Sequence, residues 1–266
     1  MKLFYRKLGK GDSLIILHGL YGCSDNWLSI ARILANNYQV YIPDLRNHGN
    51  SPHDMKHDYH VLVEDLLEFC NEHNIQKTIL IGHSMGGKLA MSFALLFPYM
   101  IEKLVIIDIS PRSYLNVESF REHKKQHDEI IHALLNVDFK KIKNRTDVDE
   151  LLSESIKSKR IRQFLLKNLK RNKDSSYQWK FNLKAIHENL EKTMDSIVLL
   201  SENKTCLSPA LFIKGTNSNY ILDSEEEDIK NTFPSSAIVR IKDAGHWVHA
   251  EKTDIFLAEI ETFLAD

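Results

Sequence analysis

Short apolar runs alternate along this chain with longer segments in which apolar residues recur every three or four positions. Runs of this length predict buried strands, and the longer spacing predicts helices with one apolar face. One helix is expected to begin near Tyr59, and the last is expected from Thr253 to Leu264. Strands that alternate with helices predict a mostly parallel sheet with helices on both of its faces. The expected strands are residues 14–17, 38–42, 78–81, 104–108, 210–214 and 237–241.

The alternation stops after Ser110 and Pro111. From about residue 112 to residue 200 the sequence is helical in pattern and rich in charge, with no strand candidate as clear as those before it. Strand spacing resumes near Ala210. We therefore expect an α/β core in two parts, residues 1–111 and 205–266, with a helical cap at residues 112–204 inserted between them.

Composition restricts the class of protein. The chain has 266 residues and a net charge of −1, so it is large enough for one capped α/β sheet and has no general attraction to nucleic acid or anionic membranes. It opens with no signal-peptide pattern and has no apolar run long enough to span a bilayer. Cys23, Cys70 and Cys206 are odd in number and lack metal-type spacing, which indicates free thiols in a reducing compartment. We expect a soluble, cytoplasmic protein without nucleic-acid partners or stable membrane insertion; the oligomeric state stays open.

A Gly-x-Ser-x-Gly motif, residues 82–86, follows the expected strand 78–81 and precedes a helical pattern. In this context the motif forms a sharp turn that exposes the serine hydroxyl at the edge of a sheet. Gly82 and Gly86 suit the turn because it leaves no room for larger side chains. Ser84 is therefore the candidate nucleophile, although the same pentapeptide also occurs as a plain strand-to-helix turn.

A serine nucleophile needs a base. His246 lies in the loop after the last expected strand, so the serine precedes the histidine along the chain, as in one of the known triad orders. We expect His246 to be the base, and His249 to lie at the surface beside a helix.

The negative oxygen of a tetrahedral intermediate needs two amide donors. The His18-Gly19 step leaves the expected strand 14–17 and can turn the N–H of Leu20 toward Ser84. The N–H of Met85 follows the nucleophile and supplies the second donor.

The acid that orients His246 has two candidates. Asp108 ends an apolar strand, where a charge is costly unless it is hydrogen-bonded, as a catalytic role would require. The loop after strand 210–214 has Ser218 at the position where a carboxylate is common, and Asp223 lies a little further on. Asp108 is favoured and Asp223 is the alternative; a third interpretation is that Asp108 only caps the turn before Pro111.

These segments together resemble the α/β-hydrolase superfamily, and within it the YbfF-type bacterial esterases and their eukaryotic abhydrolase relatives. The similarity extends over nearly the whole chain, and residues 46–52, Arg-Asn-His-Gly-Asn-Ser-Pro, are its most specific part. In the numbering of that fold, strand 104–108 is the sixth, so the resemblance implies a cap after the sixth strand and the acid at Asp108. The other matching segments are residues 17–20, 25–27, 43–45, 82–88, 107–111 with Tyr114, 163–167, 179–182 and 244–252.

The resemblance implies an esterase or thioesterase that acts on small acyl substrates without a cofactor or metal. We expect His18, Tyr114, Phe164, Trp179 and Trp247 to contribute to substrate binding. Leu165, Leu166, Leu169, Trp179 and Phe181 line an acyl pocket in one interpretation and form the cap's own core in the other.

Residues 120–173 contain fifteen Lys and Arg against eight Asp and Glu. This excess either binds an anionic end of the substrate or, as we favour, forms a solvated helical face.

Two alternative functions remain. Carbon–carbon bond hydrolases and lyases of the same fold also use a serine. A catalytically silent receptor or scaffold is disfavoured because all the triad and oxyanion positions are filled. Dehalogenases and epoxide hydrolases are disfavoured because they need a carboxylate at the position of Ser84.

Overall fold

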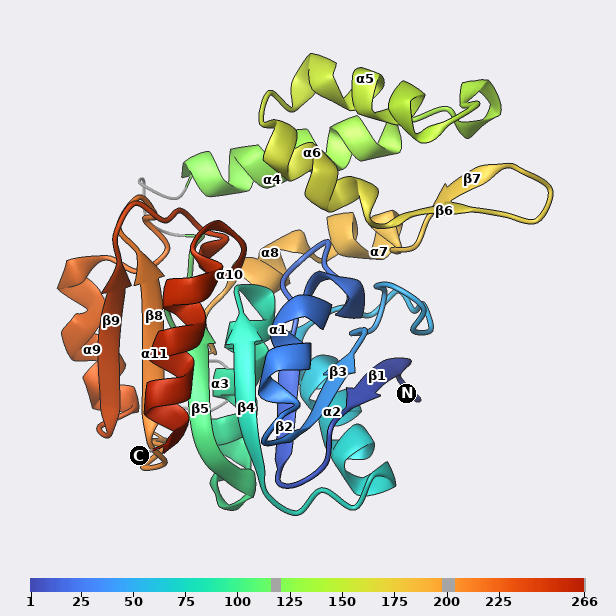
Figure 1. Ribbon diagram of the computed structural model, residues 1–266. Helices are drawn as coiled ribbons and strands as arrows, with labels where there is room; N and C mark the ends of the chain where they lie inside the picture. The colour runs from blue at the N-terminus through green and yellow to red at the C-terminus, as the bar shows by residue number, and fades with distance from the viewer. Residues whose placement is uncertain (116–120, 198–203, 266) are drawn as a thin grey trace.

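The computed structural model describes residues 1–115, 121–197 and 204–265, and its centre is a seven-stranded sheet within that part of the chain (Figure 1). The strand order is β1-β3-β2-β4-β5-β8-β9, in which β1 is antiparallel to β3 and every other neighbouring pair is parallel. The predicted mostly parallel sheet is confirmed. The strands are β1 (Tyr5–Leu8), β2 (Ser13–Leu17), β3 (Gln39–Pro43), β4 (Thr78–His83), β5 (Ile101–Ile107), β8 (Ala210–Gly215) and β9 (Ser236–Ile241).

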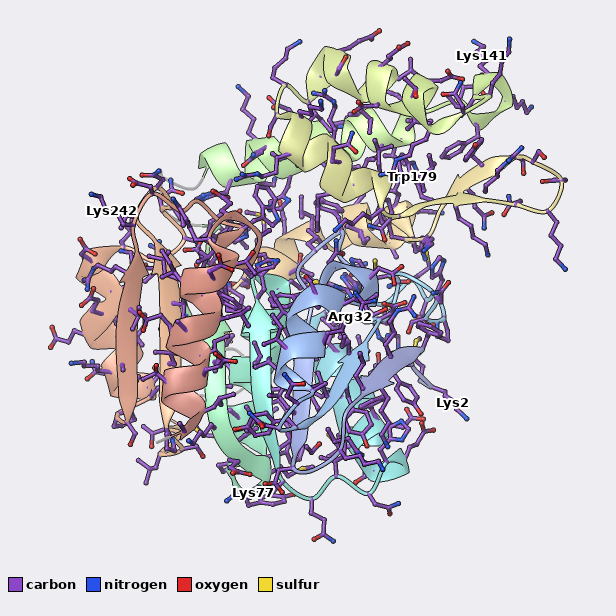
Figure 2. The ribbon with its side chains drawn as sticks, in the orientation of Figure 1. Lys2, Arg32, Lys77, Lys141, Trp179 and Lys242 are labelled. Atoms are coloured by element: carbon purple, nitrogen blue, oxygen red, sulfur yellow. The ribbon has the colours of Figure 1, made fainter. Side chains whose placement is uncertain are left out.

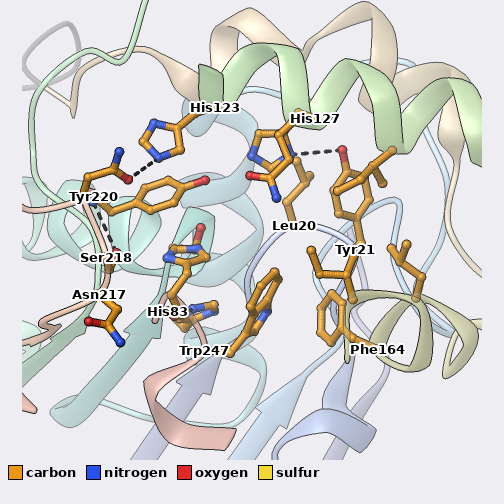
Figure 3. A pocket seen from close by; sticks show the side chains of 17 residues that line it. Leu20, Tyr21, His83, His123, His127, Phe164, Asn217, Ser218, Tyr220 and Trp247 are labelled. Carbon is orange, nitrogen blue, oxygen red and sulfur yellow. Dashed lines mark hydrogen bonds between the residues drawn. The ribbon is translucent and has the colours of Figure 1, made fainter. Parts of the chain in front are cut away.

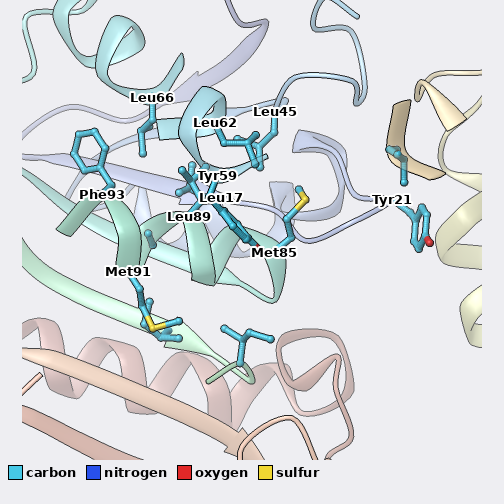
Figure 4. Close-up of a cluster of buried hydrophobic side chains, with 14 of the residues drawn as sticks. Leu17, Tyr21, Leu45, Tyr59, Leu62, Leu66, Met85, Leu89, Met91 and Phe93 are labelled. Carbon is cyan, nitrogen blue, oxygen red and sulfur yellow. The ribbon is translucent and has the colours of Figure 1, made fainter. Parts of the chain in front are cut away.

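Helices cover both faces of the sheet, as the alternation of patterns predicts (Figure 1). Successive residues of a strand point to opposite faces. In β2, Leu14 and Ile16 therefore pack with α1 and α11. Ile15 and Leu17 pack with α2 and α3, and Figure 4 shows Leu17 among side chains of these two helices. The helices of the first face are α1 (Leu28–Leu34), α10 (Val248–Glu251) and α11 (Thr253–Ala265), and those of the second are α2 (Tyr59–Glu72), α3 (Met85–Leu96) and α9 (Glu226–Thr232).

The elements between β5 and β8 form a further layer above the carboxyl ends of the strands, which we call the upper layer (Figure 1). Lys141, at its outer end, points into solvent, and Trp179 lies within it (Figure 2). The elements of the upper layer are α4 (Arg121–Leu135), α5 (Arg145–Ser155), α6 (Lys159–Leu166), β6 (Leu169–Arg171), β7 (Tyr177–Trp179), α7 (Leu183–Glu188) and α8 (Leu190–Met194).

Two expectations about the strands need correction. The upper layer is not purely helical, because β6 and β7 pair as an antiparallel hairpin of three residues on each side. Strands this short carry no readable alternation of apolar and polar residues. The strand that the fold's numbering makes the sixth is β5, the fifth along this chain, and Asp108 follows its last residue.

Lys88 joins the core to both ends of the upper layer. This residue of α3 is buried, and its ammonium group donates hydrogen bonds to the carbonyl oxygens of Arg112 at 2.8 Å, of Met194 at 3.3 Å and of Asp195. Arg112 precedes the upper layer and the other two residues end it. The helix that follows Ser84 is thereby connected to the segments that enter and leave the roof of the site.

Cys23, Cys70 and Cys206 are buried free thiols. None of the helices in the described ranges has both the length and the apolar character needed to cross a membrane.

Candidate active site

Ser84 occupies a strained turn between β4 and α3. Its backbone has φ 53° and ψ −121°, a positive φ that residues other than glycine rarely adopt. A Cβ atom at Gly82 would lie 2.3 Å from the carbonyl oxygen of Gly86, and one at Gly86 would lie 2.4 Å from that of Leu17. The strand, tight turn and helix that the motif requires are therefore all present.

A hydrogen bond joins His246 to Asp108. His246 follows β9, and its Nδ1 lies 2.8 Å from Oδ2 of Asp108. Nδ1 donates this hydrogen bond to the carboxylate, which leaves Nε2 without a proton and able to accept one. Ser84 and His246 line the same cavity, although no hydrogen bond between described residues joins Ser84 Oγ to the ring. Such contacts are often long before a substrate is bound.

The carboxylate of Asp108 is fully buried and receives three donors. Besides His246, the N–H of Gly215 donates to Oδ1 at 3.0 Å and the hydroxyl of Ser218 donates to Oδ2. Burial raises the pKa of Asp108 to about 7, whereas the hydrogen bonds from Ser218 and Gly215 act in the opposite direction. Ser218, at the position where a carboxylate is common, thus supports the carboxylate that comes from β5.

Asp223, the alternative acid, lies elsewhere. Its side chain is 76% exposed and pairs with Lys214 at 2.7 Å and with Arg240 at 3.4 Å. The lysine ammonium lowers the pKa of Asp223. This carboxylate has its own surface partners, and the geometry favours Asp108 as the partner of the imidazole.

The surroundings of His246 keep its ring neutral and oriented. Burial lowers the pKa of His246 to about 3, so the imidazole is uncharged at neutral pH. The ring stacks on Tyr220, with 3.9 Å between centroids and 19° between planes. Below it, Nε2 of His83 donates a hydrogen bond of 2.9 Å to the carbonyl oxygen of His246. Backbone and ring are therefore both fixed.

Leu20 and Met85 present two amide groups beside Ser84. Neither N–H donates to an acceptor among the described residues, and both residues border a cavity that Ser84 also lines. Gly19 allows the close approach, because a Cβ there would lie 2.8 Å from Nδ1 of His83 and 3.2 Å from Cβ of Ser84. Two unpaired donors next to a nucleophile suit a developing oxyanion.

A cavity of about 180 Å³ lies over Ser84, between the core loops and helices α4 and α6 (Figure 3). Phe164 and Trp247, two of the residues that the sequence predicts to bind substrate, line it. The other residues that line it are Leu20, Tyr21, His83, His123, Gln126, His127, Ile130, Ile161, Leu165, Asn217, Ser218, Asn219, Tyr220 and His246.

The remaining expected binding residues lie apart from this cavity. Tyr114 borders a smaller cavity that Ser84 also lines. His18 is buried within the oxyanion turn, where its Nε2 accepts from the N–H of Leu45 at 2.9 Å. Trp179 stacks on Phe181 in the core of the upper layer, with 5.4 Å between ring centroids. His18 and Trp179 are not among the described residues that line either cavity, and their expected contact with substrate stays a prediction.

Four further residues were expected either to line an acyl pocket or to form the cap's own core. Leu165, Leu166, Leu169 and Phe181 all pack in the hydrophobic core, and of these Leu165 also lines the larger cavity.

Three rings around the site were not expected. His127 contacts the hydroxyl of Tyr21 at 3.3 Å, and Nε2 of His123 donates to the amide oxygen of Asn219 at 2.7 Å (Figure 3). The third ring is that of Tyr220. The spacing of four between the two histidines is a signal that they share one face of a helix.

His249 was expected at the surface and is buried instead. Its ring stacks on Trp27, with 4.2 Å between centroids and 14° between planes. The helix that contains it, α10, has four residues, too few for an apolar periodicity to reveal burial.

In the described part of the chain no group of three or more His, Cys, Asp or Glu is arranged to hold a metal ion.

Comparison with families of known proteins gives a match over most of the chain. The family described as alpha/beta hydrolase fold matches residues 12–253. The chain is 37% identical to sn-1-specific diacylglycerol lipase ABHD11 of Danio rerio, over 96% of this chain and 80% of that protein. It is 34% identical to esterase YbfF of Escherichia coli (strain K12), over 95% of this chain and 93% of that protein.

A solved structure described as a marine microorganism esterase superposes with a TM-score of 0.93. The two chains are 42% identical, and the alignment covers 98% of this chain and 99% of the other.

Proposed function

This chain belongs to the α/β-hydrolase fold family, and we propose that it is a serine hydrolase in which Ser84 attacks carboxylic esters or thioesters to form an acyl-enzyme. The contact that carries the proposal is Nδ1 of His246 at 2.8 Å from the buried carboxylate of Asp108, in a cavity shared with Ser84. The similar proteins named esterase and lipase support the same class of reaction.

The proposed reaction has two acyl-transfer steps. Nε2 of His246 takes the proton of the Ser84 hydroxyl as Oγ bonds to the carbonyl carbon. The N–H groups of Leu20 and Met85 receive the oxyanion, and ionised Asp108 stabilises the imidazolium. When the tetrahedral intermediate collapses, the bond to the leaving oxygen or sulfur breaks, and the imidazolium gives that atom its proton. A water molecule then attacks the acyl-enzyme by the same proton transfers, which releases the acid and restores the serine.

The other functions considered have less support. The three similar proteins described above are named as esterases or a lipase, which disfavours a carbon–carbon bond hydrolase or lyase. A scaffold protein would not need a serine in the strained turn of residues 82–86 together with the hydrogen bond between Asp108 and His246.

The organisation proposed for the molecule follows from the same site. Residues 112–204 act as a cap over a core made of residues 1–111 and 205–266, since α4 and α6 contribute the roof of the cavity.

The substrate is a small-molecule ester or thioester, and the chemistry needs no cofactor. The cytoplasm is the proposed location, because its reducing conditions keep three buried thiols free.

The basic excess of residues 120–173 is proposed to be a solvated face. No Lys or Arg is among the described residues that line the larger cavity. Several of these cations pair with carboxylates instead, as Arg162 does with Asp149 at 2.7 Å and Arg160 does with Glu251 at 2.9 Å.

Hydrolysis of p-nitrophenyl butyrate tests the proposed function. We expect Ser84→Ala to lower kcat by at least about 10⁴-fold, because the acyl-enzyme cannot form. Ser92→Ala is a matched control in the same helix, where the hydroxyl donates to the carbonyl of Lys88, and it should retain the wild-type rate. Similar rates for Ser84→Ala and the wild type would refute the assignment.

A further inference from the structure

Two cavities meet at Ser84. The second has a volume of about 30 Å³ and is bordered by residues of α2, α3 and α8. Leu20, Ser84, His127 and Tyr220 line both cavities. The second alone is lined by Tyr59, Met85, Lys88, Ile109, Tyr114, Thr193 and Met194.

The chemistry assigns the two cavities to different parts of the substrate. His246 must deliver a proton to the leaving atom, so the leaving group has to lie on the side of the imidazole. His246 lines the larger cavity and does not line the smaller one. With the carbonyl oxygen at the N–H groups of Leu20 and Met85, the remaining substituent of the carbonyl carbon points into the smaller cavity. That substituent is the acyl chain.

The polar side chains that line only the smaller cavity already donate their hydrogens within the protein. Lys88 donates to three carbonyl oxygens, and the hydroxyl of Tyr59 donates to the carbonyl of Thr193 at 2.7 Å. The hydroxyl of Tyr114 donates to the carbonyl of Tyr220 at 2.6 Å, and that of Thr193 donates to Leu190 at 2.8 Å. A carboxylate placed here would lose its hydration without gaining these donors, which is unfavourable. The cavity therefore suits an uncharged chain.

The volume limits the length of that chain. One water-sized group needs a cavity volume of about 10–15 Å³. A cavity of about 30 Å³ therefore accepts about two to three such groups beyond the carbonyl carbon. Lys88 and Met194 form part of its wall, and the contacts of Lys88 with both ends of the upper layer hold that side chain in place.

We propose that the smaller cavity is the acyl pocket and that the enzyme selects short, uncharged acyl groups of up to about four carbons, while the larger cavity receives the leaving group. This inference rests on the proposed function of Ser84. Selection of short acyl groups distinguishes the proposed activity from that named for the relative, a diacylglycerol lipase.

The test is a series of p-nitrophenyl esters with acetyl, butyryl, hexanoyl and octanoyl groups, which differ only in the acyl chain. We expect kcat/KM to be greatest at butyryl or below and to fall at least about tenfold by octanoyl, because added methylenes find no space. Met194→Ala enlarges the pocket and should raise the ratio of octanoyl to butyryl kcat/KM about tenfold. Met194→Val removes less volume and should change the ratio in the same direction if the alanine variant does not fold.

Ile130→Ala is the matched control, because Ile130 lines only the larger cavity. The leaving group is the same throughout the series, so this variant should leave the octanoyl to butyryl ratio unchanged. A wild-type rate on octanoyl equal to that on butyryl, or equal shifts in the Met194 and Ile130 variants, would overturn the inference. Ser84→Ala assayed on the same esters keeps the two ideas distinct, since activity retained there refutes the proposed function instead.

Discussion

Nδ1 of His246 lies 2.8 Å from Oδ2 of Asp108, although 138 residues separate the two along the chain. The contact depends on the parallel arrangement of the sheet. Asp108 follows β5 and His246 follows β9, and the carboxyl ends of parallel strands meet at one edge. The buried carboxylate thereby fixes which nitrogen of the imidazole carries the proton, and the free nitrogen is left for Ser84.

Asp108→Asn should lower kcat by about 10⁴-fold, because an amide no longer stabilises the imidazolium or fixes the reactive tautomer. Asp223→Asn is the matched control, since that side chain is exposed and bound to Lys214 and Arg240. Its activity should remain within about twofold of wild type. Kinetics on p-nitrophenyl butyrate compare the two variants, and a loss confined to Asp223→Asn would reverse the assignment of the acid.

Ser218→Ala should move the acidic limb of the kcat/KM profile to higher pH. The Ser218 hydroxyl stabilises the ionised form of Asp108, so its loss raises the pKa of that carboxyl further above the ordinary range. The limb belongs to the coupled pair of Asp108 and His246 and should shift upward by about one pH unit. Ser208→Ala, whose hydroxyl donates to the carbonyl of Ile101 at the other end of the sheet, should leave the profile unchanged. An unshifted limb in Ser218→Ala would show that Ser218 does not tune the pair.

Lys88→Met should lower the free energy of unfolding by about 2–4 kcal/mol, because buried carbonyl oxygens lose their donor. Lys103→Met is the control, since that ammonium also donates to two carbonyl oxygens, of Phe263 and Leu264, but is only half-buried. Urea unfolding should show the larger loss for Lys88→Met. Equal losses would indicate that the hydrogen bonds of Lys88 to the upper layer add no more to the free energy of unfolding than those of Lys103.

The folded state should lose stability as the pH falls from 7 to 5. Burial holds the pKa values of several histidines at about 3 to 4, below the unfolded value of 6.5, so the unfolded chain binds more protons in this range. For each such histidine, the free energy of unfolding falls by about 1.4 kcal/mol per pH unit below 6.5. The raised pKa of Asp108 has the opposite effect on the free energy of unfolding, for one group. The histidines are His18, His48, His57, His83, His127 and His246.

Urea unfolding at several pH values measures this slope. His57 lies outside the proposed catalytic groups. The variant His57→Gln should reduce the slope of the free energy of unfolding against pH by up to about 1.4 kcal/mol per pH unit, the contribution of one proton. A free energy of unfolding that does not change between pH 7 and 5 would contradict the prediction.

The sequence predicts those strands that are buried on both faces, because such strands read as continuous apolar runs. β2 and β4 are of this kind, and their expected and observed ranges agree within two residues. β1 is an edge strand of four residues that alternates little in burial, and β6 and β7 have three residues each. Pairing with a neighbour, rather than local pattern, decides whether such segments become strands.

Within the site, local motifs predict Ser84 in its turn and the amides of Leu20 and Met85. The stacking of Tyr220 on His246 and the division of space around Ser84 could not be predicted, because each depends on side chains that only the tertiary fold brings together. His249 illustrates the same limit, since its burial comes from Trp27, more than two hundred residues earlier in the chain.

Labelling with a fluorophosphonate, followed by peptide mapping by mass spectrometry, tests the central claim most directly. The account predicts one stoichiometric adduct on the peptide that contains Ser84, absent in Ser84→Ala and formed at least about 10³-fold more slowly in His246→Ala. An adduct on a different residue, or labelling of Ser84 at the same rate without His246, would contradict it.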